Sequence, residues 1–364
     1  MTDYTDAFEH LLAQDVFSLN AAKKREALMP VFDALHHHHF QHSDAYRNIT
    51  SSNTDLMLAK PSDSAGLPYL AVRLFKQFSL SSVPQSEVFR MLQSSGTTSQ
   101  TPAKVVLDKA TSARQSKVLV KIMQSIIGKQ RLPMLIIDSP SVLKNKALSA
   151  RAAGIQGMAF FGRKPVYALN DDMSLNINTL HEFQAEYGEQ PVLVFGFTFM
   201  VWASFVQALK KNKVTLSLPK GILIHSGGWK KLIDQQVDNA TFKAGVKNQC
   251  GISRVHNFYG MAEQVGTVFI ECEHGHLHAP TLADIIVRST TDLSVLPQNH
   301  TGLIQVLSSI PTSYPGYSLL TEDLGRILGE DDCPCGRKGK YFEVLGRLPK
   351  TEVRGCSDTQ EGKA

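Results

Sequence analysis

The sequence predicts an α/β fold in which a layered core with a mainly parallel sheet precedes a small β-rich subdomain. Between residues 108 and 260, short apolar runs typical of buried strands alternate with longer segments of helical spacing, the order found in parallel α/β sheets. After Thr267 the predicted strands are short and follow one another without helices, which indicates antiparallel pairing. The expected segments are an N-terminal helical segment (1–60), an α/β core (61–266), a β-rich subdomain (267–347) and a C-terminal tail (348–364).

The individual elements follow from the spacing of apolar residues. Ligands of parallel sheets bind at the carboxyl ends of strands, so the residues that follow the strands are the first candidates for a site. The predicted helices are Ala7–Leu12, Ala21–Leu35, Lys109–Gly128, Leu180–Tyr187 and about 233–248. The predicted strands are Val88–Leu92, Lys104–Leu107, Pro133–Asp138, Gly157–Phe161, Val192–Phe195, Gly221–His225, Val255–Tyr259, Val268–Glu271, Ile285–Arg288, Leu303–Leu307 and Tyr341–Leu345.

Composition excludes several classes of protein. A chain of 364 residues that is 43% hydrophobic and 20% charged can bury a large core, so it is neither disordered nor fibrous. The formal net charge of +5 suits an anionic substrate, but no dense Lys/Arg block indicates nucleic-acid binding. Five cysteines, an odd number, and the absence of a signal-like start predict reduced thiols and a cytoplasmic location.

Two stretches invite functional interpretations that the residues do not favour. The uncharged stretch Val192–Leu209 is long enough to span a membrane, but its polar Thr198 and Gln207 favour a buried strand followed by a buried helix. We therefore expect no membrane span. The run His36–His39 cannot turn four imidazoles towards one metal ion on a helix, so we expect a helix face with some histidines packed and others solvated.

The segment Ser94–Lys104 has the composition of a phosphate-binding loop. It combines hydroxyl side chains, one glycine and a lysine, which together supply short donors, a close backbone approach and a cation for a polyphosphate. The predicted strands on both sides make it a loop between strands, unlike a P-loop, which opens a helix. The alternative is a polar hairpin loop without a ligand. Its candidate ligands are Ser95, Gly96, Thr97, Thr98 and Lys104.

Four further motifs follow the phosphate loop in a fixed order, and the first two come at the ends of predicted strands. They are Gly227-Gly228-Trp229-Lys230, Tyr259-Gly260-Met261-Ala262-Glu263, Thr321-Glu322-Asp323 and Leu345-Gly346-Arg347. With the phosphate loop, this order resembles the adenylate-forming enzymes, whose loop reads Ser-Gly-Thr-Thr-Gly-x-Pro-Lys. The loop departs from that pattern at Ser99 and in the spacing around Pro102. Gly227-Gly228-Trp229-Lys230 and the tail Arg354-Gly355-Cys356 are most similar to the acyl-protein synthetases of bacterial luminescence and their relatives.

This resemblance implies a function and a role for each motif. The loop and Lys104 would hold the phosphates of ATP, and Tyr259 and Gly260 would contact adenine beside Gly227 and Gly228. Glu263 would hold Mg²⁺, while Asp323 and Arg347 would bind the ribose. Two alternatives stay open: Glu263 as a carboxylate at a helix start, and Arg347 as a surface cation.

Three thiols and one imidazole form a possible metal site. Cys272 and His278 are close in sequence and Cys333-Pro334-Cys335 follows at long range, a Cys₃His set that suits tetrahedral zinc in a reducing compartment. Phenylacetate-CoA-ligase-like relatives have a similar arrangement, which favours His278 over His274 and His276. The alternative is a turn with free cysteines.

The end of the chain carries a candidate nucleophile. Cys356 follows Gly355 and lies near Lys350 and Arg354, and such cations favour the thiolate. It resembles the cysteine that luminescence acyl-protein synthetases acylate before passing the acyl group to an acyl reductase partner. An idle, exposed cysteine is the alternative. Few residues follow Arg347, so we expect the mobile C-terminal domain of adenylate-forming enzymes to be missing or vestigial.

We therefore expect an ATP-dependent synthetase that activates a fatty or other carboxylic acid as acyl-AMP and transfers the acyl group to a protein thiol. An acyl- or aryl-CoA ligase and a non-catalytic nucleotide-binding subunit are the alternatives. Large apolar side chains near one predicted strand end could line an acyl pocket or simply pack in the core: Phe195, Phe197, Phe199, Val201 and Trp202.

Overall fold

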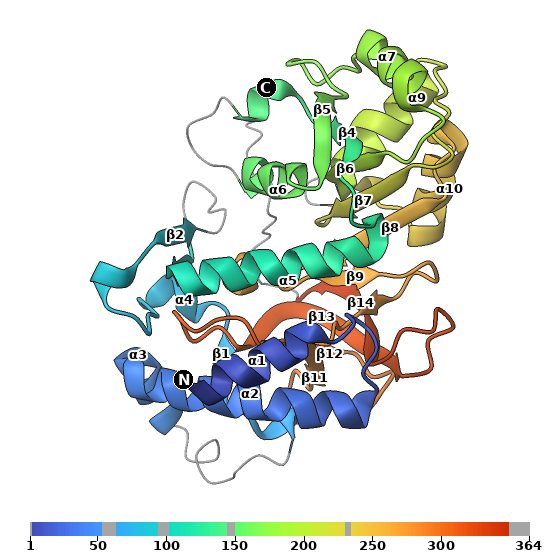
Figure 1. Ribbon diagram of the computed structural model, residues 1–364. Coiled ribbons are helices and arrows are strands. Elements are labelled where there is room, and N and C mark those ends of the chain that lie inside the picture. The colour runs from blue at the N-terminus through green and yellow to red at the C-terminus, as the bar shows by residue number, and fades with distance from the viewer. Residues whose placement is uncertain (1, 53–62, 94–101, 144–149, 230–233, 349–364) are drawn as a thin grey trace. The chain divides into compact units, whose positions relative to one another are not determined.

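The computed structural model describes residues 2–52, 63–93, 102–143, 150–229 and 234–348 (Figure 1). The chain divides into two compact units. One contains the described parts of residues 1–126 and 260–352, and the other contains residues 127–259 with the same restriction. The four-segment division expected from the sequence stays a prediction.

The unit of residues 127–259 is built on a parallel sheet. Its strands follow the order β5-β4-β6-β7-β8, and each pairs in parallel with its neighbour. The five strands are β4 (Leu132–Ile137), β5 (Gly162–Tyr167), β6 (Leu193–Phe197), β7 (Ile222–Ser226) and β8 (Arg254–Tyr259). β4 and β6 are buried along their whole length, which explains why their sequences are continuous apolar runs. The predicted parallel α/β core is thus confirmed.

Helices alternate with these strands (Figure 1). They are α6 (Ala150–Ala159), α7 (Ile177–Tyr187), α8 (Thr198–Met200), α9 (Ala208–Lys211) and α10 (Asn239–Cys250), with a π-helix at Val201–Gln207 between α8 and α9. The uncharged stretch from Val192 is therefore a buried strand that leads into helix, as expected. No helix in the described ranges is long and apolar enough to cross a membrane. The helix predicted from about 233 begins only at Asn239.

One predicted strand in this unit is wrong. Gly157–Phe161 was expected to be extended, yet Gly157 and Met158 belong to α6 and the next strand begins at Gly162. The buried residues of α6 include Ala152, Ile155 and Met158, which are three positions apart and form one helix face. A short apolar run is compatible with either structure, and here the preceding residues extend the helical spacing.

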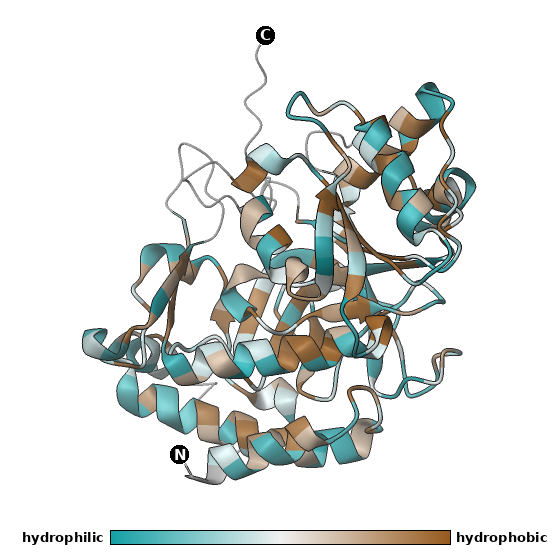
Figure 2. Ribbon diagram, turned by 45° about the horizontal axis from the view of Figure 1, so that its top comes forward, coloured by the Kyte–Doolittle hydropathy of each residue, from teal (hydrophilic) through white to brown (hydrophobic). Residues whose placement is uncertain are grey.

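The N-terminal part of the other unit is mainly helical. Helices α1 (Thr2–Ala13) and α2 (Ala21–His42) pack against each other, and Figure 2 shows hydrophilic and hydrophobic residues on both. The remaining elements are α3 (Asp44–Ser51), β1 (Leu70–Ala71), α4 (Leu74–Gln77), β2 (Arg90–Gln93), β3 (Lys104–Leu107) and α5 (Lys109–Ile127). The histidine run lies on α2 as expected, since His39 is fully buried and His37 is exposed.

An antiparallel sheet completes this unit. Its strands follow the order β11-β12-β13-β14-β10-β9, which confirms the predicted β-rich region. They are β9 (Phe269–Glu271), β10 (Leu277–His278), β11 (Ala283–Arg288), β12 (Gly302–Ser308), β13 (Ser318–Glu330) and β14 (Lys340–Arg347). The 13-residue strand β13 was not predicted. Its pairing with β14 shifts register twice, so its side chains do not follow the strict alternation that identifies a strand.

A charged group ties α2 to this sheet. Asp284 Oδ2 lies 2.9 Å from Lys340 Nζ, and Asp284 Oδ1 lies 3.8 Å from Lys24 Nζ. Lys24 Nζ also donates to the carbonyl oxygen of Ala279 at 3.0 Å. Burial opposes ionisation of Asp284, but Lys340 and Lys24 outweigh it and hold the pKa of that carboxyl below its ordinary value. The carboxylate therefore pairs with two cations, the buried Lys24 and the half-buried Lys340.

Candidate functional site

Two of the predicted adenine-binding segments lie next to each other in the unit of residues 127–259. Strands β7 and β8 pair in parallel, and Ser226 lies opposite Phe258 at their carboxyl ends. Ser226 Oγ donates to the carbonyl oxygen of Phe258 at 3.0 Å, which joins the two strand ends. Gly227 and Gly228, which follow β7, are exposed, and Tyr259 ends β8 half-buried. The sheet thus presents two open glycines beside an aromatic ring.

The strands on both sides of the predicted phosphate loop form a hairpin in the other unit. β2 and β3 are antiparallel, and Gln93 pairs with Lys104 at the loop end of the ladder. Lys104 is the exposed first residue of β3. The two strands expected on either side of the loop are confirmed. Ser95, Gly96, Thr97 and Thr98 lie outside the described residues.

Glu263 is a buried carboxyl in this second unit. It belongs to the short 3₁₀ helix Ala262–Gln264 and is only 8% exposed. Burial raises its pKa; the charge of Arg347 lowers it, and that of Asp323 raises it. The neighbouring Gln264 fixes the turn, because its amide donates to the carbonyl oxygens of Val306 and Gly316 at 3.1 and 2.8 Å. A cation at this carboxyl would favour its ionised form.

The residues predicted to bind ribose face each other across two strands. Asp323 on β13 and Arg347 on β14 are paired positions, and Arg347 Nε lies 3.4 Å from Asp323 Oδ1. The charges of both residues shift the pKa of Glu263, so the three side chains interact electrostatically. Gly260, directly after Tyr259, is the first residue of the last chain segment of the same unit.

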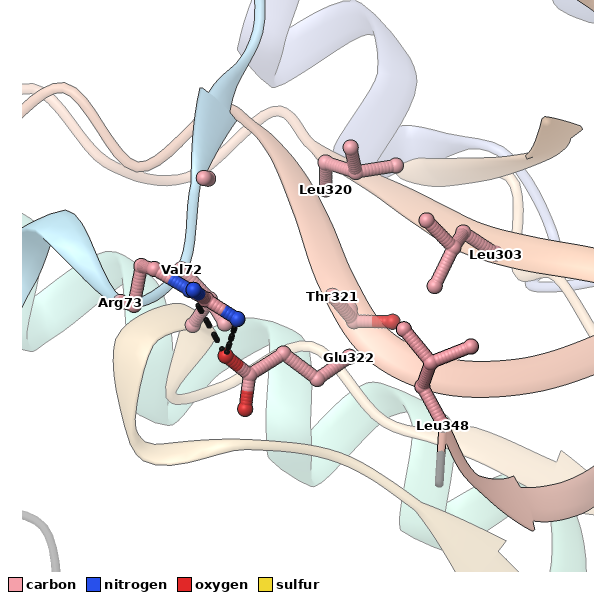
Figure 3. Close-up of a pocket in the computed structure, with 8 residues that line it drawn as sticks. Val72, Arg73, Leu303, Leu320, Thr321, Glu322 and Leu348 are labelled. Atoms are coloured by element: carbon pink, nitrogen blue, oxygen red, sulfur yellow. Dashed lines mark hydrogen bonds and ion pairs between the residues drawn. The ribbon is translucent and has the colours of Figure 1, made fainter. Parts of the chain in front are cut away.

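A pocket of about 280 Å³ is lined by Glu322 and Leu348, the sequence neighbours of Asp323 and Arg347 (Figure 3). Its walls are mostly apolar, with Leu303, Leu320 and Leu348 among them. Arg73 closes one side through an ion pair with Glu322, at 2.7 Å from Nη2 to Oε1. Sequence reasoning did not single out Arg73. The sequence pointed only to its partner Glu322, which lies between Thr321 and Asp323 in one of the motifs. The Arg73–Glu322 ion pair depends on the pairing of β1 with β13.

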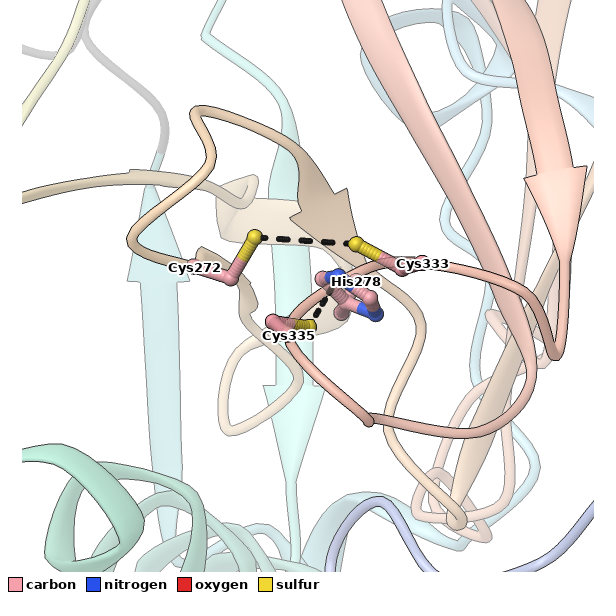
Figure 4. Close-up of side chains that lie close together, drawn as sticks. All are labelled: Cys272, His278, Cys333 and Cys335. Atoms are coloured by element: carbon pink, nitrogen blue, oxygen red, sulfur yellow. Dashed lines mark hydrogen bonds between the residues drawn. The ribbon is translucent and has the colours of Figure 1, made fainter.

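The four predicted metal ligands converge in the antiparallel region (Figure 4). Cys272 directly follows β9, His278 lies in β10, and Cys333 and Cys335 belong to the segment between β13 and β14. One ligand atom from each lies within 4.8 Å of the other three. Strand β10 pairs with both β9 and β14, and this pairing brings the two distant cysteine segments together.

The spacing of these atoms fits a tetrahedral ion. Cys272 Sγ lies 3.9 Å from Cys333 Sγ, and Cys335 Sγ lies 3.4 Å from His278 Nε2. With Zn–S bonds of about 2.3 Å and a Zn–N bond of about 2.0 Å, tetrahedral geometry requires S–S and S–N separations of roughly 3.8 and 3.5 Å. Burial raises the pKa of Cys333 to about 12 and lowers that of His278 to about 3. A bound dication would reverse the effect on the thiol, because it stabilises the thiolate.

The candidate acyl-pocket residues lie in the unit of residues 127–259. Phe195, Phe197, Val201 and Trp202 are buried, whereas Phe199 is half-buried. Trp202, in the π-helix, stacks on Phe242 with ring centroids 5.9 Å apart. Phe242 also contacts His225 and Trp229, and sequence reasoning missed this ring because it lies on α10. The acyl-pocket role of these side chains stays a prediction. Cys356 lies outside the described residues.

A family profile described as "Acyl-protein synthetase, LuxE" matches residues 5–363. The chain belongs to this acyl-protein synthetase family. The resemblance stated from the motifs is therefore confirmed, although the roles of single residues stay predictions. No curated protein sequence matches the chain.

Solved structures show the fold of this family member. An open conformation of 2-hydroxyisobutyryl-CoA ligase in complex with 2-HIB-AMP and CoA is 17% identical, with a TM-score of 0.69, over 92% of this chain and 77% of that chain. The same ligase in the thioesterification state, with 2-HIB-AMP and CoA, is 16% identical, with a TM-score of 0.68, over 92% and 70%. The fold is thus that of an adenylate-forming enzyme, as predicted.

Proposed function

We propose that the protein uses ATP and Mg²⁺ to activate a fatty acid, or another carboxylic acid, as acyl-AMP and then transfers the acyl group to the thiol of Cys356. The observation that carries this proposal is the match to the acyl-protein synthetase family across residues 5–363. Family membership supports a ligase that forms acyl-adenylates. The acyl chain and the protein thiol are the further steps proposed here.

The first half of the reaction explains the charges of the candidate residues. A carboxylate oxygen attacks the α-phosphorus of ATP, the bond to the bridging oxygen breaks, and pyrophosphate leaves. Lys104 is exposed beside the phosphate loop and would neutralise negative charge on the phosphates. Mg²⁺, which Glu263 would hold, supplies Lewis-acid stabilisation of that charge. Asp323 and Arg347 would orient the ribose, and Tyr259 would stack on adenine.

The second half requires a thiolate. Its sulfur attacks the acyl carbonyl carbon, the carbon–oxygen bond to AMP breaks, and AMP leaves while the thiol proton passes to solvent. Cys356 is preferred on sequence grounds, because Lys350 and Arg354 lie close to it along the chain and favour ionisation. A thioester formed there could pass to an acceptor protein such as an acyl reductase.

We also propose a structural zinc ion held by Cys272, His278, Cys333 and Cys335. The support is the donor set and the spacing of its ligand atoms, which suits tetrahedral coordination. The ion would join the end of β9 to the β13–β14 connection and would take no part in the reaction.

CoA is the alternative acceptor, because the ligase that shares this fold was solved with CoA. Pyrophosphate exchange into ATP, followed by intact-mass measurement of the protein, separates the possibilities. We expect exchange only with a fatty acid present, and an acyl mass increase that hydroxylamine removes. Acyl-CoA formation without labelled protein would favour the CoA ligase, and no acid-dependent exchange would favour a nucleotide-binding subunit.

The carrier thiol is tested with two cysteine variants. Cys356→Ser should keep acid-dependent exchange but lose the hydroxylamine-labile label. Cys250→Ala is the matched control and should keep both, because Cys250 is fully buried in α10 and burial raises its thiol pKa to about 12. A thioester label that persists in Cys356→Ser would assign the carrier to another cysteine.

A further inference from the structure

The two cysteine segments of the metal cluster have the same local shape. In each, the glycine three residues after a ligand cysteine donates its N–H to that cysteine's carbonyl oxygen, at 3.0 Å for Gly275 and Cys272 and 2.9 Å for Gly336 and Cys333. Both glycines adopt a left-handed conformation, with φ of +84° and +82°. Both cysteines are buried, so a residue that contacts both turns also helps to fix the relative positions of two ligands.

His276 joins them. Its carbonyl oxygen accepts from the N–H of Cys272 at 2.9 Å, and its ring Nδ1 lies 3.3 Å from Cys333 Sγ. The ring stacks on Tyr341, with centroids 4.9 Å apart and planes 27° apart, which restricts its rotation. The same tyrosine stacks on the ligand His278, at 5.7 Å. His276 therefore contacts one ligand cysteine on each turn, and it stacks on the same tyrosine as the ligand His278.

His276 lies outside the ligand set itself. The four atoms that approach one another within 4.8 Å come from Cys272, His278, Cys333 and Cys335. Three thiolates around one Zn²⁺ leave a net charge of −1, and a hydrogen bond donated to a thiolate sulfur stabilises that excess charge.

We infer that His276 is a positioning residue of the metal site, which donates its Nδ1–H to the Cys333 thiolate and joins the two cysteine turns. The inference rests on the proposed zinc ion but is independent of the acyl chemistry. It requires the Nδ1-protonated form of the ring, since only that nitrogen faces the sulfur. Loss of the donor should leave four ligands in place and make the ion easier to remove.

Three variants separate the hydrogen bond from the packing of the ring. His276→Phe keeps a flat ring against Tyr341 but removes the donor, whereas His276→Asn places an amide N–H near the position of Nδ1. His274→Ala is the matched control on the same turn, because His274 is exposed. Zinc content is measured in each purified, reduced protein, and the rate of zinc transfer to a chromogenic chelator is measured next.

We expect about one zinc per chain in all three variants, with release about 10- to 100-fold faster for His276→Phe. His276→Asn and His274→Ala should stay within about threefold of the wild type, on the same scale. In the cobalt-substituted proteins, the sulfur-to-cobalt charge-transfer band should shift for His276→Phe and not for His274→Ala, because only the first changes a hydrogen bond to sulfur.

Three outcomes would overturn the inference. Equal zinc release rates for the wild type and His276→Phe would show that the proposed hydrogen bond does not retain the ion. Loss of zinc from His276→Phe together with its retention in His278→Ala would make His276 a ligand. Absence of zinc from the wild-type protein would contradict both this role of His276 and the proposed zinc ion. The proposed acyl-AMP formation is tested separately, by acid-dependent pyrophosphate exchange, and does not depend on this result.

Discussion

The metal cluster and the candidate nucleotide residues differ in how the chain assembles them. All four metal ligands belong to one compact unit. The three cysteines come from two turns, and His278 lies in β10, which pairs with β9 and β14. The candidate nucleotide residues are divided, because Gly227, Gly228 and Tyr259 belong to residues 127–259 and the others to the second unit. A cluster inside one unit should affect folding, whereas residues divided between units should affect turnover with little effect on the stability of either.

The largest expected effect is loss of the metal ion through its ligands. Cys272→Ser should reduce zinc well below one ion per chain and lower the unfolding temperature, because metal binding contributes directly to the folding free energy of such sites. Metal analysis and thermal unfolding of reduced protein check this. Cys250→Ala, a buried thiol outside the cluster, should retain the ion. Full zinc content and unchanged stability in Cys272→Ser would show that Cys272 is not a zinc ligand.

Asp284→Ala should come next in size. Removal of the carboxylate leaves the buried Lys24 and the half-buried Lys340 without their shared partner, and breaking a buried ion pair typically costs about 3–5 kcal/mol. Denaturant unfolding measures the change in free energy. Asp33→Ala, an exposed position on the same helix α2, should change it by less than about 0.5 kcal/mol.

The same group predicts an acid dependence of stability. The folded-state pKa of Asp284 lies below its ordinary value, so its contribution is present above about pH 4 and is lost as the pH falls through the folded pKa. Wild-type stability should therefore fall more steeply below pH 4 than that of Asp284→Asn. Parallel acid profiles for the two proteins would show that the carboxylate is not stabilised by the lysines.

Glu263→Gln tests the candidate nucleotide residues rather than the metal cluster. If the carboxylate holds Mg²⁺, the amide should lower acid-dependent pyrophosphate exchange about 100-fold or more, as loss of a transition-state charge partner does. Stability should change little, because the side chains have the same shape. Lys109→Ala, an exposed residue at the start of α5, should keep full exchange. Strong unfolding of Glu263→Gln with normal exchange in the folded fraction would assign this carboxyl to folding.

Phe199→Ala should produce the smallest effect. Phe199 is half-buried in α8, at the carboxyl end of β6, and its loss should shift the preferred acyl chain length by one or two methylenes, worth about 1–3 kcal/mol in selectivity. Exchange rates with a series of fatty acids measure the preference. Leu209 is fully buried in α9, so Leu209→Ala should lower stability without a shift in the preferred acyl chain length. An unchanged preference in folded, active Phe199→Ala would leave core packing as the role of this ring.

Local periodicity was enough to predict much of this protein. The apolar runs of β4 and β6, the helical spacing of α2 and the strands on both sides of the phosphate loop depend on neighbours within a few residues, so the sequence determines them. The order of the motifs along the chain predicted the family, because each motif is a short run of neighbouring residues. The Cys₃His set was predicted from its donor types, which suit zinc, and the resemblance to phenylacetate-CoA-ligase-like relatives selected His278.

Tertiary structure decided the features that depend on distant partners. The register shifts of β13 hide a 13-residue strand from any periodic pattern, and α6 replaces a predicted strand because its burial follows helical spacing. The contact of His276 with Cys333, and that of Arg73 with Glu322, join residues 57 and 249 positions apart. Such pairings arise from strand registers that close long loops, and no local preference of either segment encodes them.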